Sequence, residues 1–414
     1  MLKDAVAINR ASDGAARLGE IDMLRGFVIM LMALDHVRDY FFAGGLLIDP
    51  LDPAQTTPLL YATRWITHLC APTFIFLAGL SAYLQARKGK TGPALSRFLL
   101  TRGLWLIFVE ATILSFGWSF GFPYPFFLQV IWAIGWSMIA LAALVLLPRA
   151  AVLATGLAIV FGHNLLDPVT PAQFGDASLL WTFLHEGGPI FIGQQPIGLA
   201  AYPILPWIGV MAVGYGAGPL FVEPAAARDR KLLMIGAAML ALFLLLRFTG
   251  LYGEPQAAPA TGNYAAGGSW RDQTAPGAQI MTFFNVQKYP PSLLFLLATL
   301  GASALLFPLL SRIKGFAAKA LLAFGAVPFF FYVLHLYLVH ALAIAANAAA
   351  GRDVDGLFNY LINAFTAPEK LGGLGFGLAG VYLAWVAVLA ILYPACRWFA
   401  EVKKRRKDWW LSYL

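Results

Sequence analysis

The chain has 414 residues, of which 60% are hydrophobic and only 12% are charged, and its formal net charge is +8. This composition excludes an ordinary soluble globular domain and indicates an integral membrane protein. The basic residues lie in short segments between apolar runs, a placement that favours orientation in a bilayer over nucleic-acid binding, so we expect no nucleic-acid partner.

Three regions follow one another along the chain. Residues 1–20 mix charged and small residues and lack the apolar core and cleavage site of a secretory signal, so we expect a cytoplasmic N-terminal segment that is retained. A single transmembrane domain is predicted over residues 21–400. Residues 401–414 form a basic cytoplasmic tail that contains "KKRRK".

The apolar runs predict an all-α fold, a polytopic membrane bundle. Because about 20 mostly apolar residues span a bilayer, the sequence predicts ten helices, at 22–42, 60–86, 96–117, 126–147, 150–164, 199–221, 231–251, 290–311, 320–348 and 375–400.

The charges of the loops give these helices a direction. Lys and Arg accumulate on the cytoplasmic side of membrane proteins, and alternate loops here hold the bases, beginning with Arg87, Lys88 and Lys90. Three of the intervening segments hold no Lys or Arg: "AGGLLIDPLDPAQTTP", "GWSFGFPYP" and "HNLLDPVTPAQFGDASLLWTFLHEGG". Both termini are therefore predicted to be cytoplasmic. Two outer segments, 165–198 and 252–289, are too long for plain turns, and such loops are often functional.

The first helix contains "MLRGFVIMLMALDHVRDYF", residues 23–41, with five ionisable side chains. Arg25 and His36 are eleven residues apart, which returns to within about 20° of one helix face and separates them by roughly 16 Å. Asp39 lies one turn further out on that face. Charges inside a membrane span usually face an interior cavity or a partner. We expect this helix to line such a cavity, although Arg25 alone could instead snorkel to the surface.

Other predicted helices also carry polar side chains. Arg64 and His68 are four residues apart and share a face of the second helix, and Glu110 lies near the middle of the third. In the ninth, His335 and His340 are separated by about 140° and cannot face one cavity. We favour His335 as the functional residue, with a packed histidine as the alternative, and expect His340 to be structural or interfacial.

Several other patterns have simpler explanations. Lys288 and Tyr289 precede a Pro-Pro helix start, where interfacial anchoring is the alternative to a functional role. The six histidines show no HxxxH or HExxH spacing, so no metal site is expected. Cys70 and Cys396 lie in different apolar segments and predict neither a disulfide nor a cysteine metal site. Glycine-rich membrane segments such as "GVMAVGYGAG" predict close helix packing.

Taken together, these residues resemble a known family. "IDMLRGFVIMLMALDH" resembles the opening helix of the transmembrane acyltransferase superfamily, in which an arginine, ten residues and a histidine recur; here they are Arg25 and His36. "RWITHLCAPTFIFLAG", "YPILPWIGVMAVGYGAG", "NVQKYPPSLLFLLATLG" and "GAVPFFFYVLHLYLVH" are similar to the bacterial branch related to the heparan-alpha-glucosaminide N-acetyltransferase catalytic domain. The resemblance covers about residues 18 to 400.

The resemblance implies transfer of an acetyl group from cytoplasmic acetyl-CoA, the acyl-donor substrate, to an amino or hydroxyl group of a sugar or glycoconjugate on the outer side. Eukaryotic relatives carry a histidine in the loop after the first helix, which residues 43–60 lack. The general base is therefore either His36 or His68. Asp39 or Glu110 could orient it, and Arg64 could stabilise the thioester oxyanion or hold an anionic acceptor.

The donor would bind at a second group of side chains. Arg25, at the cytoplasmic end of its helix, is placed to hold CoA phosphates, and the further candidates for donor binding are Arg38, Tyr332, His335, Lys288 and Tyr289. The family expectation also includes a multi-pass location in the bacterial inner membrane, contact with the lipid bilayer, and a homodimer.

A second function remains open from the residues alone. A proton-coupled transporter of a small anion or sugar could use His36, His68, Glu110 and His335 as a proton or substrate path through the membrane.

Overall fold

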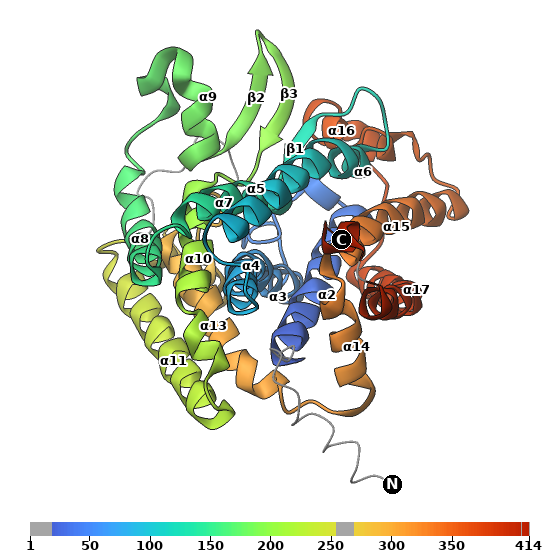
Figure 1. The fold of residues 1–414 in the computed structure, drawn as a ribbon. Helices are drawn as coiled ribbons and strands as arrows, with labels where there is room; N and C mark the ends of the chain where they lie inside the picture. Colours follow the sequence, from blue (N-terminus) through green and yellow to red (C-terminus); the bar gives the residue numbers. More distant parts are fainter. Residues whose placement is uncertain (1–18, 254–268, 407, 414) are drawn as a thin grey trace.

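A computed structural model describes residues 19–253, 269–406 and 408–413 of the chain (Figure 1). Helices account for nearly all of its regular structure, which confirms the predicted all-α membrane bundle. Most of the predicted N-terminal segment, and residues 254–268 of the second long outer segment, lie outside the described residues.

Within the described residues, seven helical segments are long and apolar enough to cross a membrane: Pro58–Arg87, Gly92–Ser119, Arg149–Leu166, Ala225–Thr249, Leu293–Leu310, Pro328–Ala349 and Leu378–Arg405. Three shorter apolar helices join them, α7 (Val130–Leu144), α10 (Leu205–Gly216) and α14 (Gly315–Ala326). These helices account for nine of the ten predicted apolar runs; the remaining run, at 22–42, is a helix that is not among the seven.

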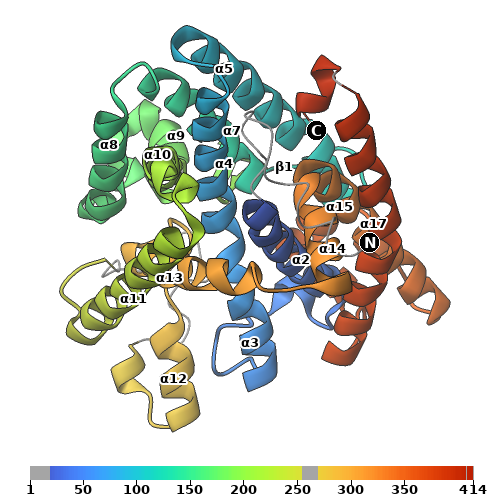
Figure 2. The same cartoon turned by 60° about the horizontal axis from the view of Figure 1, so that its bottom comes forward.

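The first of the predicted helices is α2 (Gly19–Phe41), and most of its residues are buried. It contacts α4 (Cys70–Arg87), α13 (Leu293–Leu310), α14, α15 (Pro328–Ala349) and α17 (Leu378–Arg405). In both views α2 and α4 lie near the middle of the molecule (Figures 1 and 2). The charged side chains of α2 therefore face other helices, not lipid.

Two of the other membrane segments are not continuous α-helices. The second consists of α3 (Pro58–Ile66), a 3₁₀ turn (Thr67–Leu69) and α4. The third consists of α5 (Gly92–Val109), a π-helical turn (Glu110–Leu114) and α6 (Ser115–Ser119). Turns of the latter kind occur often at functional sites.

The prediction of one continuous helix at 320–348 is wrong. The chain forms two helices there, α14 and α15, which are separated at Val327. Pro328 is the first residue of α15, and its ring disfavours a helical conformation for the preceding residue, whose φ is −135°. The apolar pattern continues through this break, so hydropathy alone did not reveal it.

A three-stranded sheet of order β1-β3-β2 lies beside the helices (Figure 1). β1 (Phe126–Leu128) pairs in parallel with β3 (Gln195–Ala200), which pairs antiparallel with β2 (Gly188–Ile192). The β2–β3 hairpin belongs to the outer segment predicted at 165–198. Because the chain first passes through the sheet, α7 begins at Val130 and α10 at Leu205, later than the sequence indicated.

The remaining α-helices of the described residues are α8 (Arg149–Gly162), α9 (Ser178–Trp181), α11 (Ala225–Thr249), α12 (Pro276–Phe284) and α16 (Tyr360–Thr366). The hydrophobic core extends through the bundle around the large buried side chains Trp118, Trp207, Phe295 and Phe331. The site described next lies within this packed interior.

Candidate active site

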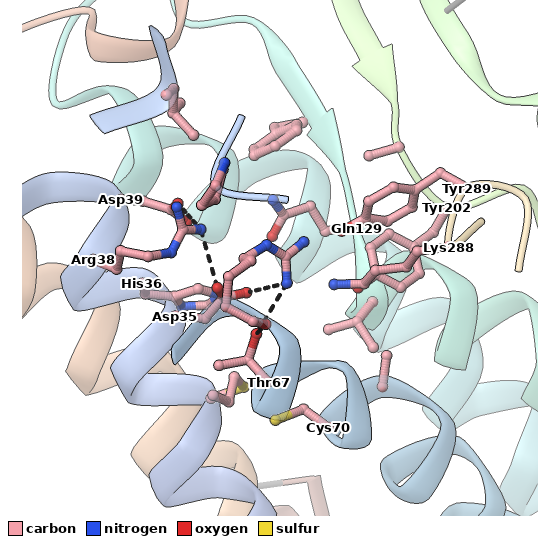
Figure 3. A pocket seen from close by; sticks show the side chains of 18 of the residues that line it. Asp35, His36, Arg38, Asp39, Thr67, Cys70, Gln129, Tyr202, Lys288 and Tyr289 are labelled. Atoms are coloured by element: carbon pink, nitrogen blue, oxygen red, sulfur yellow. Dashed lines mark hydrogen bonds and ion pairs between the residues drawn. The ribbon is translucent and has the colours of Figure 1, made fainter. Parts of the chain in front are cut away.

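A cavity of about 240 Å³ lies beside the second half of α2 (Figure 3). We call it the charged cavity because six of its lining residues carry acidic or basic groups: Asp35, Arg38, Asp39, Asp49, Arg64 and Lys288. His36, Trp118, Gln129, Tyr202 and Tyr289 also line it. Residues from α2, α3, α6 and four connecting segments thus converge on one space.

His36 pairs with the other histidine favoured from the sequence. Its Nδ1 lies 2.7 Å from Nε2 of His335, and the two ring planes are inclined by only 18°. Nδ1 of His335 lies 3.1 Å from the Phe331 carbonyl oxygen, to which it must donate. A neutral imidazole has one N–H. His335 Nε2 therefore accepts, His36 Nδ1 donates to it, and the lone pair of His36 is on Nε2.

The pair is held by aromatic side chains. Trp118 meets the His36 ring edge-on at a centroid distance of 4.9 Å, and Tyr332 does so at 6.1 Å. His335 has no exposed surface and lines neither cavity. It contacts His36 and Tyr332, each of which lines one of the cavities.

Asp35 is the centre of an ion-pair network in the charged cavity. Arg38 donates to its Oδ1 at 3.1 Å, and the Arg64 guanidinium lies 3.5 Å from its Oδ2. Arg64 is also fixed by a 2.9 Å bond to the Thr67 hydroxyl. Each guanidinium is thereby held in the cavity wall by a carboxylate (Figure 3).

Asp39 does not contact the imidazole that it was expected to orient. Its Oδ1 accepts a 2.6 Å hydrogen bond from Arg38, and its backbone carbonyl accepts one from the Tyr360 hydroxyl. Arg38 thus bridges Asp35 and Asp39, two carboxylates that lie about one helical turn apart.

Glu110 makes no hydrogen bond with His36 or His68, the two candidate bases, among the described residues. It is completely buried at the start of the π-helical turn, where its Oε1 accepts a 3.0 Å hydrogen bond from the Gln129 amide. Its Oε2 has no hydrogen-bond partner among the described residues. Glu110 lines neither cavity. Its hydrogen bond instead joins the π-helical turn to the residue that precedes α7.

His68, the other candidate base, is packed into the protein. Its Nδ1 lies 2.9 Å from the Trp65 carbonyl oxygen, and its ring meets Phe295 edge-on. It is absent from the lining of both cavities. Of the two candidates, His36 is the one that reaches a cavity.

Lys288 and Tyr289 lie opposite α2. The Lys288 ammonium is 4.9 Å from the Tyr289 ring centroid and 6.0 Å from that of Tyr202, and all three residues line the charged cavity. Lys288 points into the pocket from the side of the two tyrosines (Figure 3). The sequence drew attention to Lys288 and Tyr289 but missed Tyr202, although it lies in the quoted stretch "YPILPW".

Asp49 contributes a third carboxylate from the loop before α3. Its Oδ1 accepts a 2.9 Å hydrogen bond from the Leu51 amide, whereas Oδ2 has no partner among the described residues. Burial raises the pKa of the Asp49 carboxyl above its ordinary value.

A second cavity, of about 430 Å³, lies at the other end of α2. We call it the basic cavity because its charged lining residues are all basic: Arg25, Lys90, Arg102 and Lys403. Arg25 is oriented by Asp22 at 2.7 Å and by the Ser81 hydroxyl at 3.1 Å. The sequence identified Arg25 here, attributed Lys90 and Lys403 to membrane orientation, and missed Arg102.

The two cavities are close neighbours. Phe74 and Val130 line both of them. Tyr332 lines the basic cavity while its ring faces His36, which lines the charged cavity. A single layer of side chains therefore separates a basic compartment from a compartment that contains a histidine.

The fold and these two compartments define a polytopic helical membrane protein with a site between its helices. The family model described as Heparan-alpha-glucosaminide N-acetyltransferase, catalytic, matches residues 17–250, more than half of the chain, and the chain belongs to this family. A comparison with curated proteins found no match. Membership implies a transmembrane acetyltransferase function. Together with the apolar helices, it indicates a multi-pass integral membrane protein.

Proposed function

We propose that the protein transfers an acetyl group from cytoplasmic acetyl-CoA to an amino or hydroxyl group of a sugar or glycoconjugate on the outer side of a bacterial inner membrane, with His36 as general base. The observation that carries this proposal is the His36–His335 pair. It leaves the lone pair of His36 on Nε2, in a residue that lines the charged cavity.

The basic cavity is suited to the acyl donor. Its four basic side chains can bind the phosphates of CoA, since guanidinium and ammonium groups are the usual phosphate ligands. Apolar lining residues such as Ile29, Leu77 and Phe98 offer contacts to an extended thioester arm. The arm would approach His36 at Tyr332. In this arrangement Arg25 binds CoA phosphates, as the sequence predicts. Tyr332 lies between the donor and the proposed base.

The charged cavity is suited to the acceptor. Arg38, Lys288 and Tyr289 line it and not the basic cavity, so we reassign these three from donor binding to acceptor binding. Lys288 and Arg64 can stabilise negative charge on the thioester oxygen or on the acceptor. Asp35 can accept hydrogen bonds from sugar hydroxyl or ammonium groups.

The proposed reaction is a single proton-coupled acyl transfer. The acceptor nitrogen or oxygen attacks the thioester carbonyl carbon while His36 Nε2 takes the acceptor proton. The carbon–sulfur bond then breaks, and the proton passes from His36 to the departing CoA thiolate. The products are acetylated acceptor and free CoA, and no further reactant is required.

The test is acetyl-CoA turnover by the purified protein in lipid, with release of free thiol followed for a panel of amino sugars. We expect acceptor-dependent thiol release in the wild type. Replacement His36→Gln should lower kcat by at least about 10²-fold, the usual contribution of a general base, whereas His68→Gln should retain most of the activity.

Two results would contradict the proposal. Loss of activity in His68→Gln alone would move the base to His68. The absence of thiol release with every acceptor, combined with proton-driven uptake of a sugar or small anion into vesicles, would support the transporter instead.

A further inference from the structure

A second cluster of titratable side chains lies outside both cavities. It consists of His163, at the end of α8, Asp167, and His185, in the π-helical turn Thr182–Glu186 that follows α9. One nitrogen or oxygen from each of the three side chains lies within 4.8 Å of the others. Both histidines are buried, each with 2% of its surface exposed.

The buried imidazoles have unused hydrogen-bonding capacity. Neither ring nitrogen of His163 has a hydrogen-bond partner among the described residues, and Nδ1 of His185 has none either. His185 Nε2 lies 3.0 Å from Asp167 Oδ1. Leaving a polar group both buried and unpaired is costly, so the His163 ring requires a partner that the described residues do not supply.

The carboxylate of the cluster is already oriented by its surroundings. Asp167 Oδ2 accepts a 2.9 Å hydrogen bond from the Asn164 side chain, whose own oxygen accepts one from the Leu293 amide at the start of α13. Such outer hydrogen bonds, which fix the direction of a ligating group, are typical of protein metal sites.

We propose that His163, Asp167 and His185 bind one divalent transition-metal ion, with zinc as the favoured metal. Two imidazoles and a carboxylate are common zinc ligands, and three protein ligands leave a fourth position for water. Ligand atoms about 2 Å from a tetrahedral ion lie roughly 3.3 Å apart. Side-chain rotations that move the ligand atoms by on the order of 1 Å would therefore close the site.

The ion would connect elements that are distant in the sequence. It would join the end of α8 to the turn that leads into the β2–β3 hairpin. Leu199 of β3, and Ala201 and Tyr202 just after it, line the charged cavity. The metal would thus hold the segment that forms one wall of the cavity. This inference is independent of the acetyl-transfer proposal.

The proposal departs from the expectation of no metal site. His163 and Asp167 are four residues apart, the spacing of two ligands on one helical turn, but one of them is an aspartate. A search for two histidines at this spacing therefore does not find the pair. The third ligand comes from a separate element, and only the fold brings it near.

The test uses the full chain in lipid, freed of any affinity tag and stripped with a chelator, then titrated with Co²⁺ and afterwards with Zn²⁺. We expect one Co²⁺ per chain, the visible absorption of four-coordinate Co²⁺, its displacement by Zn²⁺, and a higher melting temperature with either metal. His163→Gln and Asp167→Asn should each weaken Co²⁺ binding by on the order of 100-fold or more.

A matched control is Asp176→Asn, which removes an exposed carboxylate from the same outer segment and should leave Co²⁺ affinity unchanged. If His163→Gln does not fold, Asp167→Asn still tests the site, because its amide can keep the hydrogen bond with His185. The proposal is overturned if the wild type shows no stoichiometric Co²⁺ spectrum, or if both ligand variants bind Co²⁺ as tightly as the wild type does.

Discussion

One chain of hydrogen bonds sets the tautomer of His36, the proposed base. It runs from the Phe331 carbonyl through His335 to His36, and each imidazole donates through Nδ1 and accepts, or is free to accept, through Nε2. The sequence places Arg25 and His36 on one helix face, yet they line different cavities. Their separation along the axis of α2 places them in different cavities although they share one helix face.

At this scale we predict that His335→Leu impairs the proposed reaction without removing a group that touches either substrate. Without an acceptor for its Nδ1 proton, His36 is free to adopt the wrong tautomer, and kcat should fall by on the order of 10²-fold while the KM for acetyl-CoA changes little. His335→Gln retains an acceptor oxygen and should recover part of the loss. Steady-state kinetics of both variants measures this. Equal activity of His335→Leu and the wild type would show that His335 does not set the tautomer.

At the scale of elements, glycines allow the helices to approach closely, as the glycine-rich membrane segments predicted. A Cβ at Gly214 of α10 would lie 2.1 Å from the Phe76 carbonyl oxygen, and one at Gly79 of α4 would lie 2.0 Å from that of Met211. Gly26 of α2 and Gly325 of α14 are equally close to the backbone of the other helix. These contacts set the positions of α2 and α4, both of which line the two cavities.

We therefore predict that Gly214→Ala lowers the free energy of unfolding by about 1–3 kcal/mol, because the methyl group meets backbone that cannot rotate away. Gly162→Ala is the matched control, since a Cβ at that position of α8 meets nothing within 4 Å. The thermal unfolding midpoint of the detergent-solubilised protein measures the difference. Equal midpoints for Gly214→Ala and the control would show that α4 and α10 are free to move apart.

For the molecule as a whole, the proposal requires that the basic cavity open to the cytoplasm. Lys90 and Lys403 line it, and both belong to segments that the loop charges assign to that side. The charged cavity is lined by residues of the loop after α2, which is assigned to the outer side.

Chemical labelling tests this orientation, because Cys70 and Cys396 are both buried and should react slowly. In sealed cells, a membrane-impermeant maleimide should label Ala54→Cys, in an exposed part of the loop before α3. It should label Lys88→Cys, which is exposed after α4, only once the membrane is permeabilised. The reverse pattern would put the basic cavity on the outside and remove its access to cytoplasmic acetyl-CoA.

The sequence by itself determined the class of protein, the position of almost every apolar helix, and the charged face of the first one. These follow from local composition, because a bilayer requires about 20 apolar residues per span and penalises charges that face lipid. The local pattern did not show the break at Val327 or the short sheet, because a backbone interruption can leave hydropathy unchanged.

Only the tertiary structure decided which histidine faces a cavity and which acid pairs with which base. Helical spacing made Asp39 a candidate to orient His36, yet its partner is Arg38, and the partner of His36 is His335, 299 residues away. The division into a charged and a basic cavity likewise depends on how distant helices cross. Periodicity gives the direction of a side chain from its own helix, whereas its neighbours are chosen by the packing of the whole bundle.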